Sequence, residues 1–189
     1  MSTVTHFSLA QYELMVESGV FSVPDPQRVE LIRGEIREMS PQGLRHAAAV
    51  NWLNQWSFES STRDATIVQC QSRTRLPELE SEPEPDVAWL TRKKYLDQPP
   101  CPDDIQLMIE VADSSLANDL GEKARLYAEA GIRDYWVVDL VADCLHVFRE
   151  PRPSGYVSHS VHRGDEAIRP LAGAAALVPG ELFAATHES

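Results

Sequence analysis

The chain has 189 residues, of which 43% are hydrophobic and 24% are charged, a length and composition typical of one soluble α/β domain. Its longest apolar stretches fall far below the roughly 20 residues that a membrane-spanning helix needs. A formal net charge of −12 weighs against a nucleic-acid binder, although net charge says little about a local patch and a divalent cation among carboxylates reverses the local charge.

The spacing of the cysteines and the character of the first residues bear on the cellular compartment of the protein. Cys70, Cys101 and Cys144 are an odd number without C-x-x-C spacing, which argues against a disulfide framework and against a zinc–thiolate site. The N-terminus has no basic region followed by an apolar segment, so it does not resemble a secretory signal. We therefore expect a single domain over residues 1–189, located in the cytoplasm and without a membrane partner.

The first elements are indicated by local signals. Ser8 followed by Gln11 resembles a capping box and predicts a short helix that ends near Gly19. Residues 29–39, VELIRGEIREM, alternate in polarity around a central Arg-Gly step, which predicts a hairpin. Residues 40–60 predict a second helix, because apolar residues recur at helical spacing at Leu44, Ala48, Trp52 and Trp56.

The residues after the second helix are expected to contain the strands of a mixed sheet. The acidic, proline-rich residues 77–86 look too polar for an interior element and predict a loop, whereas residues 118–131 predict a third helix. A turn and an edge strand are expected in residues 151–170, and the tail from Leu171 should close the domain through hydrophobic contacts. Strands are expected at residues 65–76, 86–90, 105–112, 134–139 and 144–150, with the strand–helix–strand order from 105 to 139 implying a right-handed crossover and a parallel pair.

Glu110 is the most informative polar residue. It lies within QLMIEVA, a run apolar enough for a strand covered on both faces, where an ionised carboxylate is costly unless it is paired or binds a metal. Asp86 opens the preceding strand, and adjacent strands would place both carboxylates at one edge of the sheet. Such oxygen ligands suit Mg²⁺ or Mn²⁺. The alternatives are a strand-end glutamate paired with an amide or an arginine, and an aspartate that serves only the turn.

Lys123 is the third candidate. It is expected about one turn into the third helix, on the stripe that faces the sheet, from which its ammonium group would return toward Glu110. There it would stabilise charge that develops on a phosphate. The alternative is a helix lysine whose charged end reaches solvent.

Two further polar residues and two basic clusters deserve testing. Glu30 is an acid in an apolar hairpin strand and would hold the water shell of a metal or a second ion, or serve only the strand. His46, near the start of the second helix, would contact phosphate or Glu30, or serve a structural purpose. Basic residues at Arg73 and Arg75, and again at residues 92–94, form either a local patch or ordinary solvated surface.

These residues give the chain a resemblance to the Uma-type family of bacterial restriction-endonuclease-like proteins, over roughly residues 8–183. The matching blocks are VELIRGEI, SPQGLRH, EPDVAWL and MIEVADSSLANDLGEKARLYAEAGIRDYWVVD, the last being the most specific. The resemblance implies an α/β fold of the PD-(D/E)XK type, in which helices flank a central mixed sheet. It also implies metal-dependent cleavage of phosphodiesters.

Carried onto this sequence, the resemblance makes Asp86 and Glu110 the acids of the two half-motifs. Lys123 matches a lysine that looks to have moved from the strand to the helix, and the chain departs from the superfamily pattern at Ala112, where lysine is usual. Glu30 and His46 match further polar positions that line the site.

The sequence therefore predicts a nuclease that acts on DNA and depends on Mg²⁺ or Mn²⁺, held by Asp86, Glu110 and the carbonyl group of Val111. Lys123 would assist the attacking water, and a homodimer is expected because cutting two strands commonly needs two sites. Two alternatives stay open. One is a non-catalytic binding or regulatory module that retains the fold, and the other is a metal-dependent hydrolase of small phosphate esters.

Overall fold

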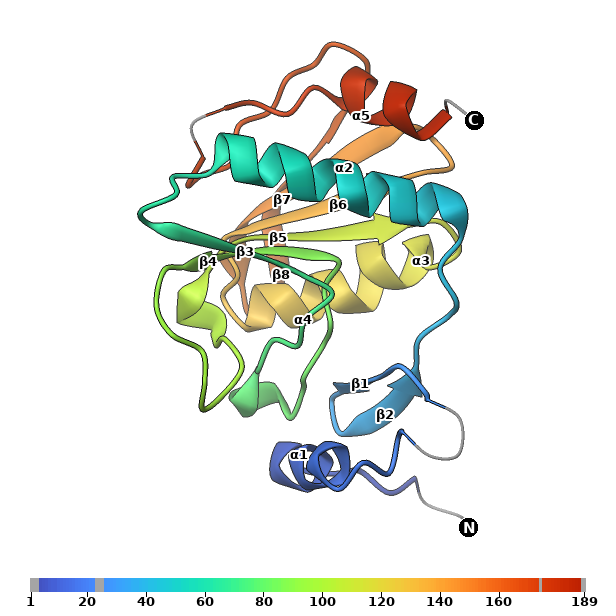
Figure 1. The fold of residues 1–189 in the computed structure, drawn as a ribbon, viewed down its shortest axis with the longest axis vertical. Helices are drawn as coiled ribbons and strands as arrows, with labels where there is room; N and C mark the ends of the chain where they lie inside the picture. Colours follow the sequence, from blue (N-terminus) through green and yellow to red (C-terminus); the bar gives the residue numbers. More distant parts are fainter. Residues whose placement is uncertain (1–3, 23–25, 174, 188–189) are drawn as a thin grey trace.

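A computed structural model describes residues 4–22, 26–173 and 175–187 of the chain. A six-stranded mixed sheet forms the middle layer (Figure 1). Its strands follow the spatial order β3 (Thr66–Cys70), β4 (Val87–Thr91), β5 (Ile105–Ala112), β6 (Asp134–Asp139), β7 (Cys144–Arg152) and β8 (Gly155–His162).

Helices cover both faces of this sheet, as Figure 1 shows. On one face lie α2 (Leu44–Ser60) and α5 (Pro179–His187), and on the other lie α3 (Leu116–Asn118), the π-helical turn Asp119–Lys123 and α4 (Ala124–Glu129). Two 3₁₀ turns lie in the connections, at Pro77–Leu79 and Pro102–Asp104. Helix α1 (Leu9–Glu17) and the hairpin of β1 (Val29–Ile32) and β2 (Glu35–Glu38) form a separate layer beside the α4 face.

The centre of the sheet follows the sequence closely. Strands β5 and β6 have the predicted bounds and are parallel, with Glu110 opposite Val137, while all other neighbours in the sheet are antiparallel. The crossover between β5 and β6 contains α3 and α4, as the strand–helix–strand order predicted. The predicted edge strand within residues 151–170 is β8.

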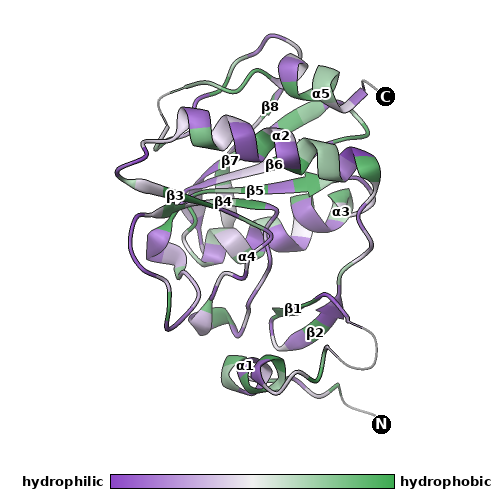
Figure 2. Cartoon of the chain, viewed as in Figure 1, coloured by the Kyte–Doolittle hydropathy of each residue, from purple (hydrophilic) through white to green (hydrophobic). Residues whose placement is uncertain are grey.

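Hydrophobic residues fill the space on both sides of the strands. Under α2 and α5, Trp56 contacts Trp89 and Trp136, with ring centroids 5.3 and 6.0 Å apart. Under α4, Tyr135 contacts Tyr127 edge-on, with centroids 4.9 Å apart. In Figure 2 the central strands are largely hydrophobic, whereas the helices carry segments of both kinds. Because β5 is covered on both faces, a carboxylate within it is an exception.

The predicted N-terminal elements are confirmed. Ser8 and Gln11 form a capping box at the start of α1. At the tip of the β1–β2 hairpin, Arg33 and Gly34 both have positive φ angles, 51° and 80°, as a tight two-residue turn between twisted strands requires.

Two strand predictions need correction. The strand predicted over residues 65–76 ends at Cys70, because Gln71 adopts a left-handed conformation with a φ of 50° and its N–H donates to the Asp86 carbonyl group. The strand predicted to begin at Asp86 begins at Val87, so Asp86 lies just outside the sheet.

The acidic loop at residues 77–86 was wrongly predicted to be too polar for the interior. Ser81 and Glu82 are fully buried, since Glu82 pairs through its backbone with Leu31 of β1 and through its carboxylate with Arg73, at 3.0 Å. Backbone pairing and one ion pair therefore offset part of the loss of solvent, while burial still raises the pKa of Glu82.

The helices on the α2 face also differ from the prediction. Leu44, expected on the buried stripe, is 93% exposed, and the buried face of α2 is formed instead by residues such as Leu53 and Trp56. The tail contains a helix that the sequence did not predict, α5, whose Leu182 and Phe183 join the same hydrophobic cluster. No helix in the described parts of the chain is long and apolar enough to cross a membrane.

Candidate active site

Five elements meet at one end of the sheet around a cavity of about 330 Å³. They are β1, the first turn of α2, the residue before β4, the carboxyl end of β5 and the π-helical turn, and residues of β2 and of the connection from β2 to α2 also line the cavity. The cavity lining contains all the side chains that the sequence singled out: Glu30, His46, Asp86, Glu110 and Lys123. Segments far apart in the chain therefore bring these candidates together.

Glu110 projects from β5 and is only 4% exposed. Its Oε1 atom accepts hydrogen bonds from Lys123 Nζ at 3.1 Å and from the Tyr127 hydroxyl at 2.7 Å. Burial raises the pKa of Glu110 to about 8, although the Lys123 ammonium acts in the opposite direction. The charged form of this carboxyl is thus costly without a further cation.

Lys123 does not extend into solvent. It is 5% exposed, and its Nζ atom lies 3.1 Å from Glu110 Oε1 and 3.2 Å from Glu30 Oε2. Burial acts to lower the pKa of Lys123, but the surrounding carboxylates outweigh it and hold the pKa above its ordinary value. The ammonium group therefore stays charged between two acids.

Asp86 is fixed by the strand next to it. Its Oδ2 atom accepts a hydrogen bond from the Val111 N–H at 2.8 Å and lies 3.2 Å from His46 Nε2. The side-chain amide of Gln71 donates to Oδ1 at 3.4 Å. The contact expected between His46 and Glu30 is not what the structure shows, because the imidazole faces Asp86 instead.

Two buried atoms at the cavity lack a hydrogen-bond partner among the described residues: Glu30 Oε2 and His46 Nδ1. Glu30 Oε2 is within ion-pair distance of Lys123, but the geometry does not make a hydrogen bond. Buried polar atoms are normally satisfied, so both atoms are free to interact with a further group in the cavity.

The match to known proteins covers most of the chain. A family model described as "Uma2: Putative restriction endonuclease" matches residues 9–178. The chain belongs to this family. A solved structure of a "putative nuclease" from Anabaena variabilis is similar at a TM-score of 0.71 and 15% identity, over 95% of this chain and 99% of that chain. No curated protein matches. The fold of this Uma2 protein is restriction-endonuclease-like, as the sequence predicted.

Two polar residues of the candidate site were not among the predicted functional residues. Asp119 is buried at the cavity, accepts a 2.5 Å hydrogen bond from the Ser115 hydroxyl, and has a pKa raised by burial. Tyr127 holds Glu110 from the helix. Asp119, Lys123 and Tyr127 follow one another at intervals of four residues, and that spacing was the available signal, since it places them on one helical face.

Three side chains of the two basic clusters form ion pairs with acids. Arg73 pairs with Glu82 at 3.0 Å and Arg75 pairs with Glu13 at 2.7 Å. In the second cluster, Lys93 lies 2.7 Å from Asp104. Neighbouring acids thus largely neutralise Arg73, Arg75 and Lys93, whereas Arg92 donates to the Thr66 carbonyl group and Lys94 is exposed.

Proposed function

We propose that this protein is a nuclease that hydrolyses phosphodiester bonds in DNA with the help of Mg²⁺ or Mn²⁺. Asp86, Glu110 and the Val111 carbonyl group would hold the ion. The observation that carries the proposal is the burial of Lys123 between Glu30 and Glu110, in the cavity that Asp86 also lines. Membership of the Uma2 family supports a nuclease-like function.

The side chains at the cavity fit a hard divalent cation. Four buried carboxyl groups and one buried ammonium group line it: Glu30, Asp86, Glu110, Asp119 and Lys123. This excess of acids favours binding of a cation, and carboxylate and carbonyl oxygens are the ligands that Mg²⁺ and Mn²⁺ prefer. Both donors to Glu110 use its Oε1 atom, so Oε2 is the oxygen proposed to face the ion.

When bound, the ion would polarise a phosphoryl oxygen and ease deprotonation of water. The side chains of the protein would orient the carboxylates that hold the ion and stabilise the charge of the reacting phosphate. Lys123, charged and held by two carboxylates, would stabilise negative charge that develops on the phosphate. The Val111 N–H and His46 fix the orientation of Asp86, and Tyr127 fixes that of Glu110.

Cleavage of DNA by purified protein tests the proposal directly. Supercoiled plasmid and single-stranded DNA would be incubated with Mg²⁺, Mn²⁺ or EDTA. We expect cleavage only with a divalent ion, and a loss of at least about a hundredfold in Asp86→Asn and in Glu110→Gln, since each removes an ionised oxygen from the centre. Glu59→Gln, an exposed acid of α2, is the matched control. Normal cleavage by either site variant would contradict the proposal.

A hydrolase of small phosphate esters is the second candidate, favoured by the net charge of −12. The two candidates respond differently to salt. Binding of DNA releases counterions and weakens steeply as salt rises, whereas binding of a small ester hardly changes. Cleavage of bis(p-nitrophenyl) phosphate without any salt-sensitive DNA binding would favour the second candidate. If the protein cuts both strands of a duplex, we also expect a homodimer in size-exclusion chromatography.

A further inference from the structure

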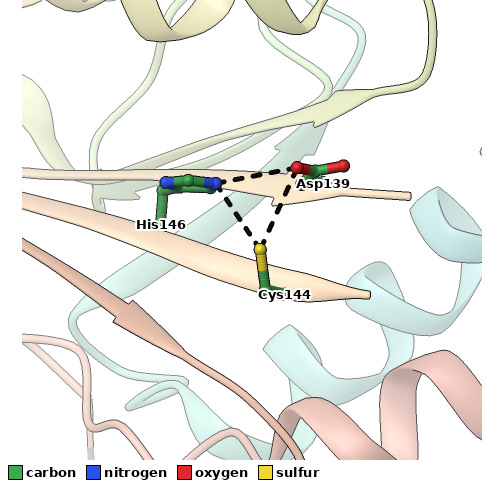
Figure 3. Close-up of side chains that lie close together, drawn as sticks. All are labelled: Asp139, Cys144 and His146. Carbon is green, nitrogen blue, oxygen red and sulfur yellow. Dashed lines mark hydrogen bonds and ion pairs between the residues drawn. The ribbon is translucent and has the colours of Figure 1, made fainter. Parts of the chain in front are cut away.

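A second cluster of metal-binding side chains lies where β6 ends and β7 begins (Figure 3). Asp139 is the last residue of β6 and pairs with Cys144, the first residue of β7. Cys144 and His146 are two residues apart on that strand, so they project to the same face. Figure 3 shows the thiol, the imidazole and the carboxylate facing one another.

The three atoms form a triangle of suitable size for an ion. Cys144 Sγ lies 3.5 Å from His146 Nε2 and 3.9 Å from Asp139 Oδ2, and His146 Nε2 lies 3.8 Å from the same oxygen. The imidazole and the carboxylate are too far apart for a direct hydrogen bond. A point equidistant from the three atoms is about 2.2 Å from each, close to the bond lengths that Zn²⁺ forms with sulfur, nitrogen and oxygen ligands.

Neighbouring groups orient two of the three ligands. The backbone N–H groups of Val141 and Ala142 both donate to Asp139 Oδ1, at 2.9 Å, which turns Oδ2 toward the cluster. His146 Nδ1 lies 3.0 Å from His159 Nε2. When Nδ1 donates its proton to His159, the lone pair on His146 Nε2 remains free for a metal, as in many metal-ligating histidines.

We propose that Asp139, Cys144 and His146 form a second metal site, for Zn²⁺ or a similar borderline transition ion. A thiolate and an imidazole favour such an ion over Mg²⁺, which separates this site from the one proposed at Asp86 and Glu110. On binding, the Cys144 thiol loses its proton to solvent and its sulfur coordinates the ion. Three protein ligands leave the fourth tetrahedral position to water.

The proposed ligand set is not visible in the spacing of the cysteines. The sequence has no C-x-x-C pair, and this spacing argued against a zinc–thiolate site. Strand pairing supplies the ligands instead, because Asp139 and Cys144 are brought together across a four-residue turn. An ion there would link the end of β6 to the start of β7 and stabilise the hairpin.

Cobalt is the sharpest probe of this proposal, because a thiolate bound to Co²⁺ gives a charge-transfer band in the near ultraviolet that oxygen ligands do not give. Metal-free protein would be titrated with Co²⁺ and then with Zn²⁺. We expect the band to saturate at one Co²⁺ per chain and to disappear when Zn²⁺ displaces it. No band at millimolar Co²⁺ would overturn the proposal.

Variants identify the ligands. Cys144→Ser should abolish the band, whereas Cys101→Ser, which changes a half-buried thiol outside the cluster, should retain it. Asp139→Asn preserves the Oδ1 acceptor of the turn and replaces Oδ2 by an amide, so a folded variant should bind Zn²⁺ at least about tenfold more weakly. His159→Ala should weaken binding about 10- to 100-fold by releasing the His146 ring.

A further control excludes binding of Co²⁺ at the proposed Mg²⁺ site as the source of the charge-transfer band. Asp86→Asn should leave the cobalt band unchanged, and its loss in that variant would overturn the inference. A band that persists in Cys144→Ser would overturn it as well.

Discussion

Replacement of Lys123 by methionine is the most direct test of how the site is built. The change removes one charge and keeps a side chain of similar length. In the wild type the ammonium lies 3.1 Å from Glu110 and 3.2 Å from Glu30 and is 5% exposed. Lys123→Met would leave two buried carboxylates facing each other without a counter-charge.

The expected cost follows from this burial. Removal of one partner from a buried ion pair costs about 3–5 kcal/mol, and each kcal/mol lowers the melting temperature of a domain of this size by about 2–4 °C, so we expect a drop of about 6–20 °C in EDTA. The drop should be larger at pH 9 than at pH 6, since burial already raises the pKa of Glu110 to about 8 and a protonated carboxyl needs no counter-charge.

Circular dichroism melts in EDTA and in Mg²⁺ would measure the effect. Lys94→Met, at an exposed lysine, is the control and should change stability by no more than about 0.5 kcal/mol. The double variant Glu30→Gln/Lys123→Met should recover part of the loss, because one of the two facing charges is gone. A melting temperature in Lys123→Met equal to that of the wild type, at pH 9 in EDTA, would refute the reasoning.

Three further predictions follow from the packing and the charge of the site. Tyr127→Phe should destabilise the protein by about 1.5–3 kcal/mol in urea unfolding, because Glu110 loses a 2.7 Å hydrogen bond; an unchanged midpoint would mean that this bond contributes nothing. The affinity for Mn²⁺ should rise about tenfold per pH unit below the Glu110 pKa of about 8 and then level off, because the metal displaces the Glu110 proton; a flat profile in titration calorimetry would exclude this competition. Leu53→Ala should lower the free energy of unfolding by about 2–5 kcal/mol, whereas Leu44→Ala on the same helix should lower it by no more than about 0.5 kcal/mol. Equal effects would contradict the burial of Leu53 and the exposure of Leu44 on α2.

The sequence predicted the interior of the fold better than its margins. The bounds of β5 and β6 were predicted correctly, because strands buried on both faces appear in the sequence as continuous apolar runs. The acidic loop at 77–86 was placed at the surface because its burial depends on backbone pairing with Leu31, which is distant in sequence, and on an ion pair between Glu82 and Arg73 that residue pattern does not reveal. Helix α5 has only nine residues and buries two large side chains, a signal too short to separate from a loop.

At the candidate site, it was easier to predict which residues take part than to predict which side chains they contact. Glu110 was detectable from local sequence alone, because an ionised carboxylate in an apolar strand is costly. The contact of His46 with Asp86, in place of Glu30, depends on how α2 meets β4 and has no local signature. The π-helical turn that carries Lys123 was equally absent from the pattern, which predicted a regular helix.

In the proposed nuclease, that turn explains how a helix would replace a strand in presenting the lysine. Met108, Glu110 and Ala112 share the face of β5 that lies under α4, and Ala112 is fully buried within the hydrophobic cluster there. A lysine at position 112 would have to displace apolar side chains in order to reach the cavity. From the π-helical turn, the Lys123 ammonium reaches Glu110 Oε1 together with the Tyr127 hydroxyl one turn later. Both donors use one oxygen, so a helix can hold the acid while its second oxygen stays available to a metal ion.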